Sequence, residues 1–344
     1  MAGRLMGPVF PGAEWERAKP DEVGLDAGRL EATRKWHADR AGEQPYRVVV
    51  VRAGRLVAEW EQGMATDEQR GMASATKSLF SCVLGIAIAE GRIGSVDDKL
   101  SEYFPEFMEV PEGRGPKPGR FVKPEDADIT FRQLISNTSG YMKPGERPGQ
   151  QFHYQTFGMN VLCHGIEQAY GLYDSSDPDG LPGIGQLIEE KIRDPIGGTW
   201  SYSYVDFEHA PEALANIFGH SPRCHATARD MARLGLLWRE KGRWGARQVV
   251  PEEWMREAVT TAPDLRANCP REEWCYGYGF WTNDHGRLCP PLPQDSFAAQ
   301  GAGQNQIWVC SSLDLVVAQS PGVFEDHWDD TNTSLILELA AACA

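Results

Sequence analysis

The segments with β-strand character lie near the two ends of this 344-residue chain, and that placement limits its fold more than any other feature. Residues 46–51 and 56–60 are rich in β-branched and aromatic side chains and flank Ala53-Gly54, which is typical of a β-hairpin. The same character returns in four segments near the other end: 276–281, 296–300, 306–310 and 313–319. Strands at both ends with helices between them predict one antiparallel sheet built from both ends of the chain.

The middle of the chain is expected to be mainly helical. Residues 75–90 form a long apolar stretch that ends at Gly91, a helix stop signal. Capping residues at Asp26 and at Thr227 with Asp230 predict the starts of two more helices. Further helices are expected at 129–135, 158–170, 184–192 and 331–343, and surface loops at 111–124 and 174–182.

These patterns predict the α/β (α+β) class, with an antiparallel sheet flanked by the N- and C-terminal helices. We expect one domain over residues 1–344. Its α/β part comes from about 1–72 and 245–344, and its mainly helical part from about 73–244.

The chain is acidic, with 34 Lys and Arg against 49 Asp and Glu and a formal charge of −15. This balance argues against nucleic acid or an anionic membrane as a partner, because both attract clustered cations. The longest apolar run, residues 79–89, is about half of the ~20 residues that a membrane span needs. Residues 1–18 lack the apolar region of a signal peptide, so we expect a cytoplasmic protein whose eight scattered cysteines are free thiols.

Ser74 and Lys77 form a Ser-x-x-Lys motif at the start of the long apolar helix. One helical turn separates them, so their Cβ atoms lie about 5–6 Å apart on one face. A serine hydroxyl becomes a nucleophile when a base takes its proton, and lysine is such a base once burial lowers its pKa. Helix N-termini also offer N–H groups to an oxyanion. Such a short motif also arises by chance, with Ser74 a helix cap and Lys77 a solvated cation.

Two further segments suit the same chemistry. Tyr154 precedes an apolar helix, where a tyrosine relays a proton to a leaving group or simply fills the core. Residues 299–304 read Ala-Gln-Gly-Ala-Gly-Gln between two expected strands. Small residues there allow a substrate to approach the backbone, and a bulge or a tight hairpin would use them as well.

Together these segments resemble the serine β-lactamase-like hydrolases, which share the class C β-lactamase and penicillin-binding-protein fold. The resemblance covers most of the chain and is greatest with the esterases and 6-aminohexanoate-dimer hydrolases of that family. It rests on VVVVRAGRLVAEW, SATKSLFSCVLGIAIAEGRIGSVDDKLSEYFPE, ITFRQLISNTSGY, PGQQFHYQT, TARDMARLGLLWREKGRW and GAGQNQIWVCSSLDLVV. By motif it implies that Ser74 is the nucleophile, Lys77 its base and Tyr154 the second proton-transfer group. The oxyanion hole would be the backbone amides of Ser74 and Ala302.

Two positions depart from the family pattern. Thr156 stands where the second motif usually has Asn, and Ala299-Gln300-Gly301 stands where the third usually has Lys-Thr-Gly or His-x-Gly. Thr156, Gln300 and Gly301 are therefore the expected substrate-binding residues, and the usual cation is missing. We expect short esters to be better substrates than β-lactams, whose carboxylate needs such a cation. A cation from residues 143–147 is the alternative anchor.

The resemblance implies a serine hydrolase (a carboxylesterase or amidase) that cleaves small-molecule esters or amides through an acyl-enzyme, with no cofactor or metal ion. Three alternatives stay open: an acyltransferase that uses the same acyl-enzyme, a β-lactamase or D-amino peptidase, and a non-catalytic ligand-binding or scaffold protein. His220, Cys224 and His225 superficially suggest metal ligands, but neither H-E-x-x-H nor paired CxxC supports them.

Overall fold

The structure is a computed structural model that describes residues 9–206, 213–323 and 330–343. Residues 1–8, which belong to the N-terminal stretch considered for a signal peptide, lie outside the described residues. In the described part of the chain, no helix combines the length and the apolar character needed to cross a bilayer. All eight cysteines are free, as the sequence predicts.

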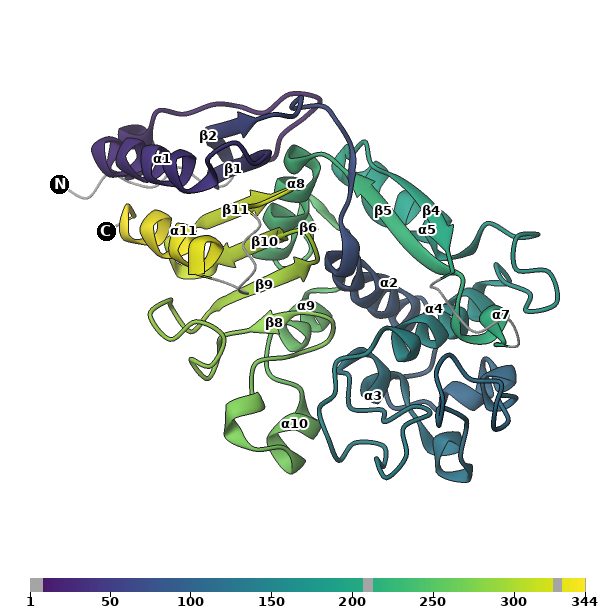
Figure 1. The fold of residues 1–344 in the computed structure, drawn as a ribbon. Coiled ribbons are helices and arrows are strands. Elements are labelled where there is room, and N and C mark those ends of the chain that lie inside the picture. The colour runs from purple at the N-terminus through teal and green to yellow at the C-terminus, as the bar shows by residue number, and fades with distance from the viewer. Residues whose placement is uncertain (1–8, 207–212, 324–329, 344) are drawn as a thin grey trace.

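A six-stranded antiparallel sheet forms one side of the molecule, in the order β2-β1-β11-β10-β9-β8 (Figure 1). Its strands are β1 (Tyr46–Arg52), β2 (Arg55–Gln62), β8 (Trp281–Thr282), β9 (Ser296–Gly301), β10 (Asn305–Cys310) and β11 (Leu315–Gln319). Strand β1 of the N-terminal hairpin pairs with β11, and Val50 lies opposite Val317. The sheet is thus assembled from both ends of the chain, which confirms the predicted fold class.

The secondary structure outside this sheet is mainly helical. The α-helices are α1 (Ala27–Ala41), α2 (Lys77–Ala89), α3 (Phe131–Ile135), α4 (Thr156–Tyr170), α5 (Gly183–Ile188), α6 (Asp194–Ile196), α7 (Ala215–Phe218), α8 (Ala228–Arg239), α9 (Glu252–Ala258), α10 (Pro263–Asn268) and α11 (Asp330–Ala341). The short 3₁₀ helices are Pro20–Val23, Ala73–Thr76, Leu100–Glu102, Pro105–Met108, Pro124–Asp128, Arg271–Glu273 and Ser311–Leu313, and a π-helical turn spans Glu189–Arg193.

Helices cover both faces of the sheet. The terminal helices α1 and α11 lie side by side on one face, and α8 packs on the other against β10, β11 and β1 (Figure 1). Val48 and Val50 belong to the core cluster on the α1–α11 side, whereas Val49 and Val51 belong to the cluster on the α8 side. Because both faces are covered, β1 is a continuous apolar run rather than an alternating one. Helix α8 lies within residues 73–244, the range predicted for the mainly helical part, but it packs on the sheet.

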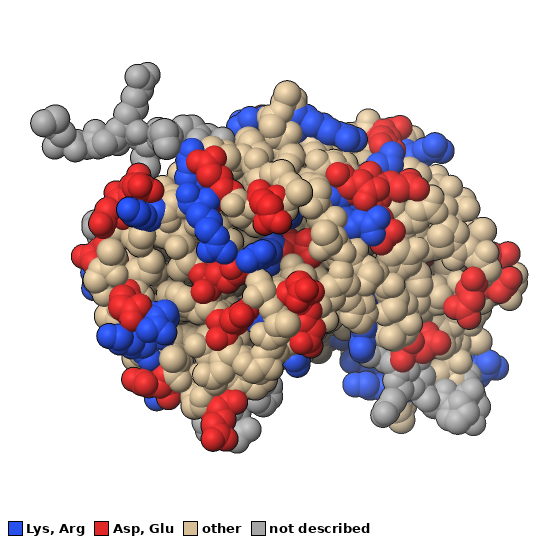
Figure 2. Space-filling view, turned by 90° about the horizontal axis from the view of Figure 1, so that it is seen from above, with Lys and Arg blue, Asp and Glu red and all other residues tan. Residues whose placement is uncertain are grey.

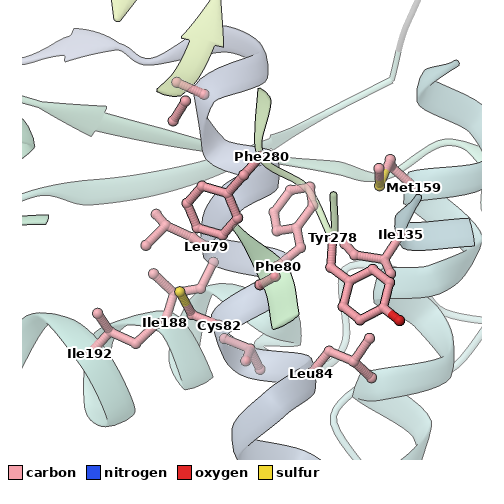
Figure 3. Packing of buried hydrophobic residues seen from close by; sticks show 14 of the residues in the cluster. Leu79, Phe80, Cys82, Leu84, Ile135, Met159, Ile188, Ile192, Tyr278 and Phe280 are labelled. Atoms are coloured by element: carbon pink, nitrogen blue, oxygen red, sulfur yellow. The ribbon is translucent and has the colours of Figure 1, made fainter. Parts of the chain in front are cut away.

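Helix α2 runs through the larger core (Figure 3). It occupies most of the predicted segment 75–90, and the 3₁₀ turn Ala73–Thr76 precedes it directly. Leu79, Phe80 and Leu84 on this helix are buried. Helices α4, α5 and α9 contact α2, so this helix is held by several neighbours.

Several local predictions are confirmed in detail. The hairpin turn uses left-handed backbone at Ala53 (φ 52°) and Gly54 (φ 72°). The Asp26 carboxylate accepts a hydrogen bond from the Arg29 N–H (2.8 Å) at the start of α1. The Thr227 hydroxyl accepts one from the Asp230 N–H (3.0 Å) at the start of α8.

The predicted strand at 276–281 is wrong for most of its length. Only Trp281 enters β8, and Tyr276 makes one isolated bridge to it. The backbone N–H groups of Tyr278 and Gly279 bond instead to carbonyls of Ala258 (3.0 Å) and Ile135 (3.1 Å). A Cβ on Gly277 would lie 2.2 Å from the Ala258 carbonyl oxygen, so this segment wraps around the helical part rather than extending the sheet.

The middle of the chain also contains two small sheets that the sequence analysis missed. One has the order β3-β5-β4 and the other pairs β6 with β7. Their strands are β3 (Arg70–Gly71), β4 (Ser201–Val205), β5 (Ser221–Ala226), β6 (Arg243–Trp244) and β7 (Arg247–Gln248). Strand β3 leads directly to the Ser-x-x-Lys turn.

Candidate active site

Ser74 lies in the 3₁₀ turn between β3 and α2, one turn before Lys77. Its Oγ is 2.9 Å from the Lys77 Nζ. Ala73, directly before it, has a φ of 50°, which a residue with a Cβ rarely adopts and which costs about 1–3 kcal/mol. The structure does not use the Ser74 side chain as a helix cap. The turn therefore presents this hydroxyl to the lysine at a local cost in backbone energy.

Lys77 is buried, and this burial changes its acid–base behaviour. Desolvation lowers its pKa from the ordinary value of 10.5 to about 8, and the nearby Cys163 thiol acts weakly in the opposite direction. Losing the surrounding water penalises the ammonium form, because a charge is poorly solvated by an apolar core. A useful fraction of neutral amine is thus present near neutral pH, within hydrogen-bond distance of the serine.

Tyr154 completes the cluster. The Lys77 Nζ lies 5.2 Å from the centroid of the Tyr154 ring. Burial raises the pKa of the Tyr154 phenol, while a hydrogen bond with the Ser74 side chain acts against this shift. The ring stacks on Trp281 with centroids 5.7 Å apart. The phenol therefore stays protonated at neutral pH and lies beside the serine.

Asn137 holds the segment that carries Tyr154. The Asn137 carbonyl oxygen accepts a hydrogen bond from the His153 N–H (2.9 Å), and its side-chain Oδ1 accepts one from the Gln155 N–H (2.9 Å). Asn137 itself has a left-handed φ of 58°, which asparagine tolerates better than most residues. The sequence analysis did not single out Asn137 as a positioning residue, although it lies in the quoted block ITFRQLISNTSGY.

Strand β9 brings its end against the serine turn. A Cβ on Gly301 would lie 2.2 Å from the Met72 carbonyl oxygen and 3.0 Å from the Ser74 nitrogen, so only glycine allows this approach. Ala302 follows and lines the same cavity as Ser74. Ser74 is the second residue of its 3₁₀ turn, where N–H groups have no partner within the helix. The segment of Gly301 and Ala302 therefore lies beside the Ser74 backbone, and the use of the Ser74 and Ala302 amides as an oxyanion hole stays a prediction.

A cavity of about 310 Å³ opens over Ser74 and Lys77. Thr156, at the start of α4, lines it as expected, and so do Asn160 and Arg223. Asn160 donates a hydrogen bond to the Phe218 carbonyl (2.7 Å), but its buried Oδ1 has no partner within the described residues. Sequence reasoning missed Asn160, although it lies one helical turn after Thr156.

Gln300 lies apart from this cavity. Side chains alternate along a strand, and Ala298 belongs to the core cluster under α1 and α11 while Ala299 belongs to the cluster on the α2 side. Gln300 therefore shares a face with Ala298, and Gly301 faces Ser74. Gln300 is not among the described residues that line the cavity, so its predicted contact with substrate has no support in the geometry.

The three residues considered as metal ligands are placed otherwise. His220 stacks on Tyr204 with ring centroids 4.2 Å apart, and Cys224 is buried in the core. His225 meets the Ser203 hydroxyl through its Nε2 (2.9 Å). Within the described ranges, no three His, Cys, Asp or Glu side chains are grouped as a metal site would need.

Comparisons with known proteins agree with this arrangement. The chain is 22% identical over 381 residues to the 6-aminohexanoate-dimer hydrolase of Paenarthrobacter ureafaciens, covering 98% of this chain and 89% of that protein. Its fold is similar to a family VIII carboxylesterase (TM-score 0.67, 15% identity, 96% and 99% of the two chains). It is also similar to EstCE1, described as a hydrolase with promiscuous acyltransferase activity (TM-score 0.63, 15% identity, 92% and 98%). The Beta-lactamase family profile matches residues 35–319, and the chain therefore belongs to the Beta-lactamase family.

Proposed function

We propose that this protein is a serine hydrolase that cleaves ester or amide bonds of small molecules through an acyl-enzyme on Ser74. The observation that carries the proposal is the 2.9 Å contact between the Ser74 Oγ and the Nζ of a buried lysine. The relative named as a 6-aminohexanoate-dimer hydrolase and the neighbour named as a carboxylesterase support the same reaction class.

Acylation follows from the order of these groups. Neutral Lys77 accepts the Ser74 proton while the Oγ attacks the substrate carbonyl carbon, and the Ser74 and Ala302 amides donate hydrogen bonds to the oxyanion. When the tetrahedral intermediate collapses, the Tyr154 phenol donates its proton to the departing alcohol or amine. Tyr154 regains a proton from the Lys77 ammonium, which returns both groups to their starting forms.

Deacylation repeats these steps with water as the nucleophile. Lys77 removes a proton from the water, whose oxygen attacks the acyl carbon, and the Ser74 Oγ leaves with that proton. If an added alcohol takes the acyl group in preference to water, the product is a new ester. Product analysis with and without added alcohol therefore separates hydrolysis from acyl transfer.

Covalent labelling tests the nucleophile directly. A fluorophosphonate probe should add one organophosphorus group to the native protein, and peptide mapping by mass spectrometry should locate it on Ser74. Prior incubation with a slowly hydrolysed p-nitrophenyl ester should protect the same residue. A label on another serine, or none at an excess of probe, would contradict the proposal.

The pH dependence of the reaction should follow the protonation state of Lys77. Because the neutral amine is the base, kcat/KM for p-nitrophenyl butyrate should rise about tenfold per pH unit at low pH. It should level off above a pKa of about 8, where Lys77 has lost its proton. Spontaneous ester hydrolysis is subtracted with Ser74→Ala protein. A profile that is flat from about pH 6 to about pH 9 would show that Lys77 does not act as the base.

Esters should be far better substrates than β-lactams. On the face of β9 toward Ser74, Ala299 is buried in the core and Gly301 has no side chain, so neither can bind the carboxylate of a cephalosporin. Losing a charge-assisted hydrogen bond in a desolvated cleft costs about 1.5–3 kcal/mol, a factor of roughly 10 to 150 in kcat/KM. The measurement compares p-nitrophenyl butyrate with nitrocefin on one preparation. Equal values would mean that a cation elsewhere serves the β-lactam carboxylate.

A further inference from the structure

A second cavity adjoins the candidate active site and is lined by positively charged side chains. Its volume is about 570 Å³, and Lys117, Arg120 and Lys143 line it together with Tyr154 and Thr156. Thr156 also lines the cavity over Ser74, so the two spaces share a wall. The chain as a whole carries a formal charge of −15, and on the face shown in Figure 2 basic side chains are interspersed with acidic ones. No Asp or Glu is among the described residues that line this second cavity.

Lys143 is the buried member of this cluster. Its side chain is 3% exposed, and its Nζ has no hydrogen-bond partner in the described part of the chain. The nearest carboxylate is that of Glu146, with 3.7 Å between the Nζ and Oε2. Glu146 also binds the His153 Nδ1 through its Oε1 (3.0 Å). Burial lowers the Lys143 pKa to about 8, Glu146 opposes this, and the charge of Arg120 lowers it further.

The other two cations are also short of partners. Neither Lys117 nor Arg120 forms an ion pair with a carboxylate of residues 9–206, 213–323 or 330–343. Of the three cations, only Lys143 lies within ion-pair distance of a carboxylate in the described residues, and an anion placed among the three would relieve their mutual repulsion.

The loop that carries Lys117 and Arg120 is fixed without a ligand. The Val122 N–H donates to the Val110 carbonyl (2.9 Å) and closes its base, and the Arg120 N–H donates to the Lys117 carbonyl (3.0 Å). A Cβ on Gly115 would lie 1.7 Å from the Arg120 carbonyl oxygen, so the loop folds back on itself at a glycine. Such preorganisation reduces the entropy lost when a ligand binds.

We propose that this second cavity binds a carboxylate of the substrate whose ester or amide carbonyl is attacked at Ser74. The inference rests on the proposed hydrolase function and narrows it to esters or amides that carry an anionic group at some distance from the scissile bond. Arg120 suits a carboxylate because its guanidinium donates two parallel hydrogen bonds. Tyr154 lies between the two cavities, since it contacts Ser74 and lines the second cavity. A small molecule that reaches from Ser74 into the second cavity would therefore pass along the Tyr154 side chain.

The test compares esters that differ only in charge. One pair is the p-nitrophenyl monoester of glutaric acid and its methyl-capped diester, which place the carboxylate on the acyl side. The other pair is 4-butyryloxybenzoate and its methyl ester, which place it on the leaving side. For each pair, the measured quantity is the ratio of kcat/KM for the acid to that for the neutral ester, compared between the native protein and each variant. This comparison cancels the difference in intrinsic reactivity between the two esters and any change in overall activity.

In at least one pair, the double variant Lys117→Gln/Arg120→Gln should lower this ratio by about tenfold or more. Arg120→Lys should lower the ratio less than the double variant does, because lysine keeps the charge but cannot donate the two parallel hydrogen bonds. Both positions are partly or fully exposed, so folding is preserved, whereas replacement of buried Lys143 risks the fold. Arg256→Gln is the matched control, because Arg256 lines a different cavity and pairs with Glu252.

Three outcomes would decide against the inference. An unchanged ratio in both pairs for the double variant would exclude the second cavity as an anion site. A ratio that falls with Arg223→Gln and not with the double variant would place the anion over Ser74 instead. Failure of all four esters to turn over in the native protein would overturn the hydrolase function itself, and the carboxylate subsite with it.

Discussion

Replacing Ser74 by alanine is expected to lower kcat/KM for p-nitrophenyl esters by at least about a thousandfold, since it removes the hydroxyl that would form the acyl-enzyme. Folding should be almost unaffected. Within the described part of the chain, the Ser74 side chain caps no helix, and its hydrogen-bond partners are Lys77 and Tyr154. Hydrogen bonds of this kind contribute about 0.5–1.5 kcal/mol each, so the melting temperature should shift by a few degrees at most.

Ser78→Ala is the matched control for this experiment. Ser78 lies one turn further along α2, is buried, and donates its hydroxyl to the Gly279 carbonyl (2.6 Å). Its loss removes one structural hydrogen bond and no reacting group, so most of the esterase activity should remain. Esterase activity in a pure Ser74→Ala preparation that equals that of the Ser78→Ala protein would contradict Ser74 as the nucleophile.

Lys77→Arg is expected to lose at least about a hundredfold in kcat, nearly as much as Lys77→Ala, because general-base catalysis typically supplies 10²–10⁴-fold. Arginine keeps the positive charge, but its pKa is too high for it to lose a proton in the protein. The two variants therefore separate a base from a structural cation. If Lys77 served only as a charge beside Ser74, the arginine variant would keep a large share of the activity.

Two additional measurements show whether a loss of activity comes from the missing base or from misfolding. Lys77→Met has a similar length and no charge, so it removes the base while filling the buried space, and its thermal melt gives the stability of a protein without this amine. Small alkylamines added to Lys77→Ala should restore part of the rate, in proportion to the concentration of their neutral form. Full activity of Lys77→Arg, or no rescue by any amine in a well-folded Lys77→Ala protein, would argue against Lys77 as the base.

Much of the fold follows from local signals in the sequence. The hairpin of β1 and β2, the capping box at Thr227 and the long apolar helix α2 all lie where the patterns predict. Each depends on contacts between residues close in the chain: a turn with left-handed backbone, a side chain bonded to an N–H three residues away, or a run of apolar residues. Such interactions join residues that are close in the chain, so they can form without any tertiary contact.

Other elements were decided by distant partners. Strand β4 alternates Ser and Tyr, a local strand signal that the sequence analysis missed, whereas β5 reads SPRCHA and is a strand only through its pairing with β3 and β4. The segment 276–281 has β-forming residues, yet its N–H groups bond to carbonyls at Ala258 and Ile135. Strand propensity is weak compared with packing and hydrogen bonding to neighbours, so tertiary contacts override it.

The candidate site divides in the same way. The spacing of Ser74 and Lys77 is a property of one helical turn, so the sequence by itself determined that these two side chains meet. The lowered pKa of Lys77 depends on burial by the surrounding core, and the face on which Gln300 lies depends on the register of β9. Lys117 and Arg120 line one cavity with Lys143, which lies in a turn more than twenty residues further along the chain. Only the tertiary structure decided these features, because desolvation and charge clustering arise from groups brought together by folding and not by neighbouring positions in the chain.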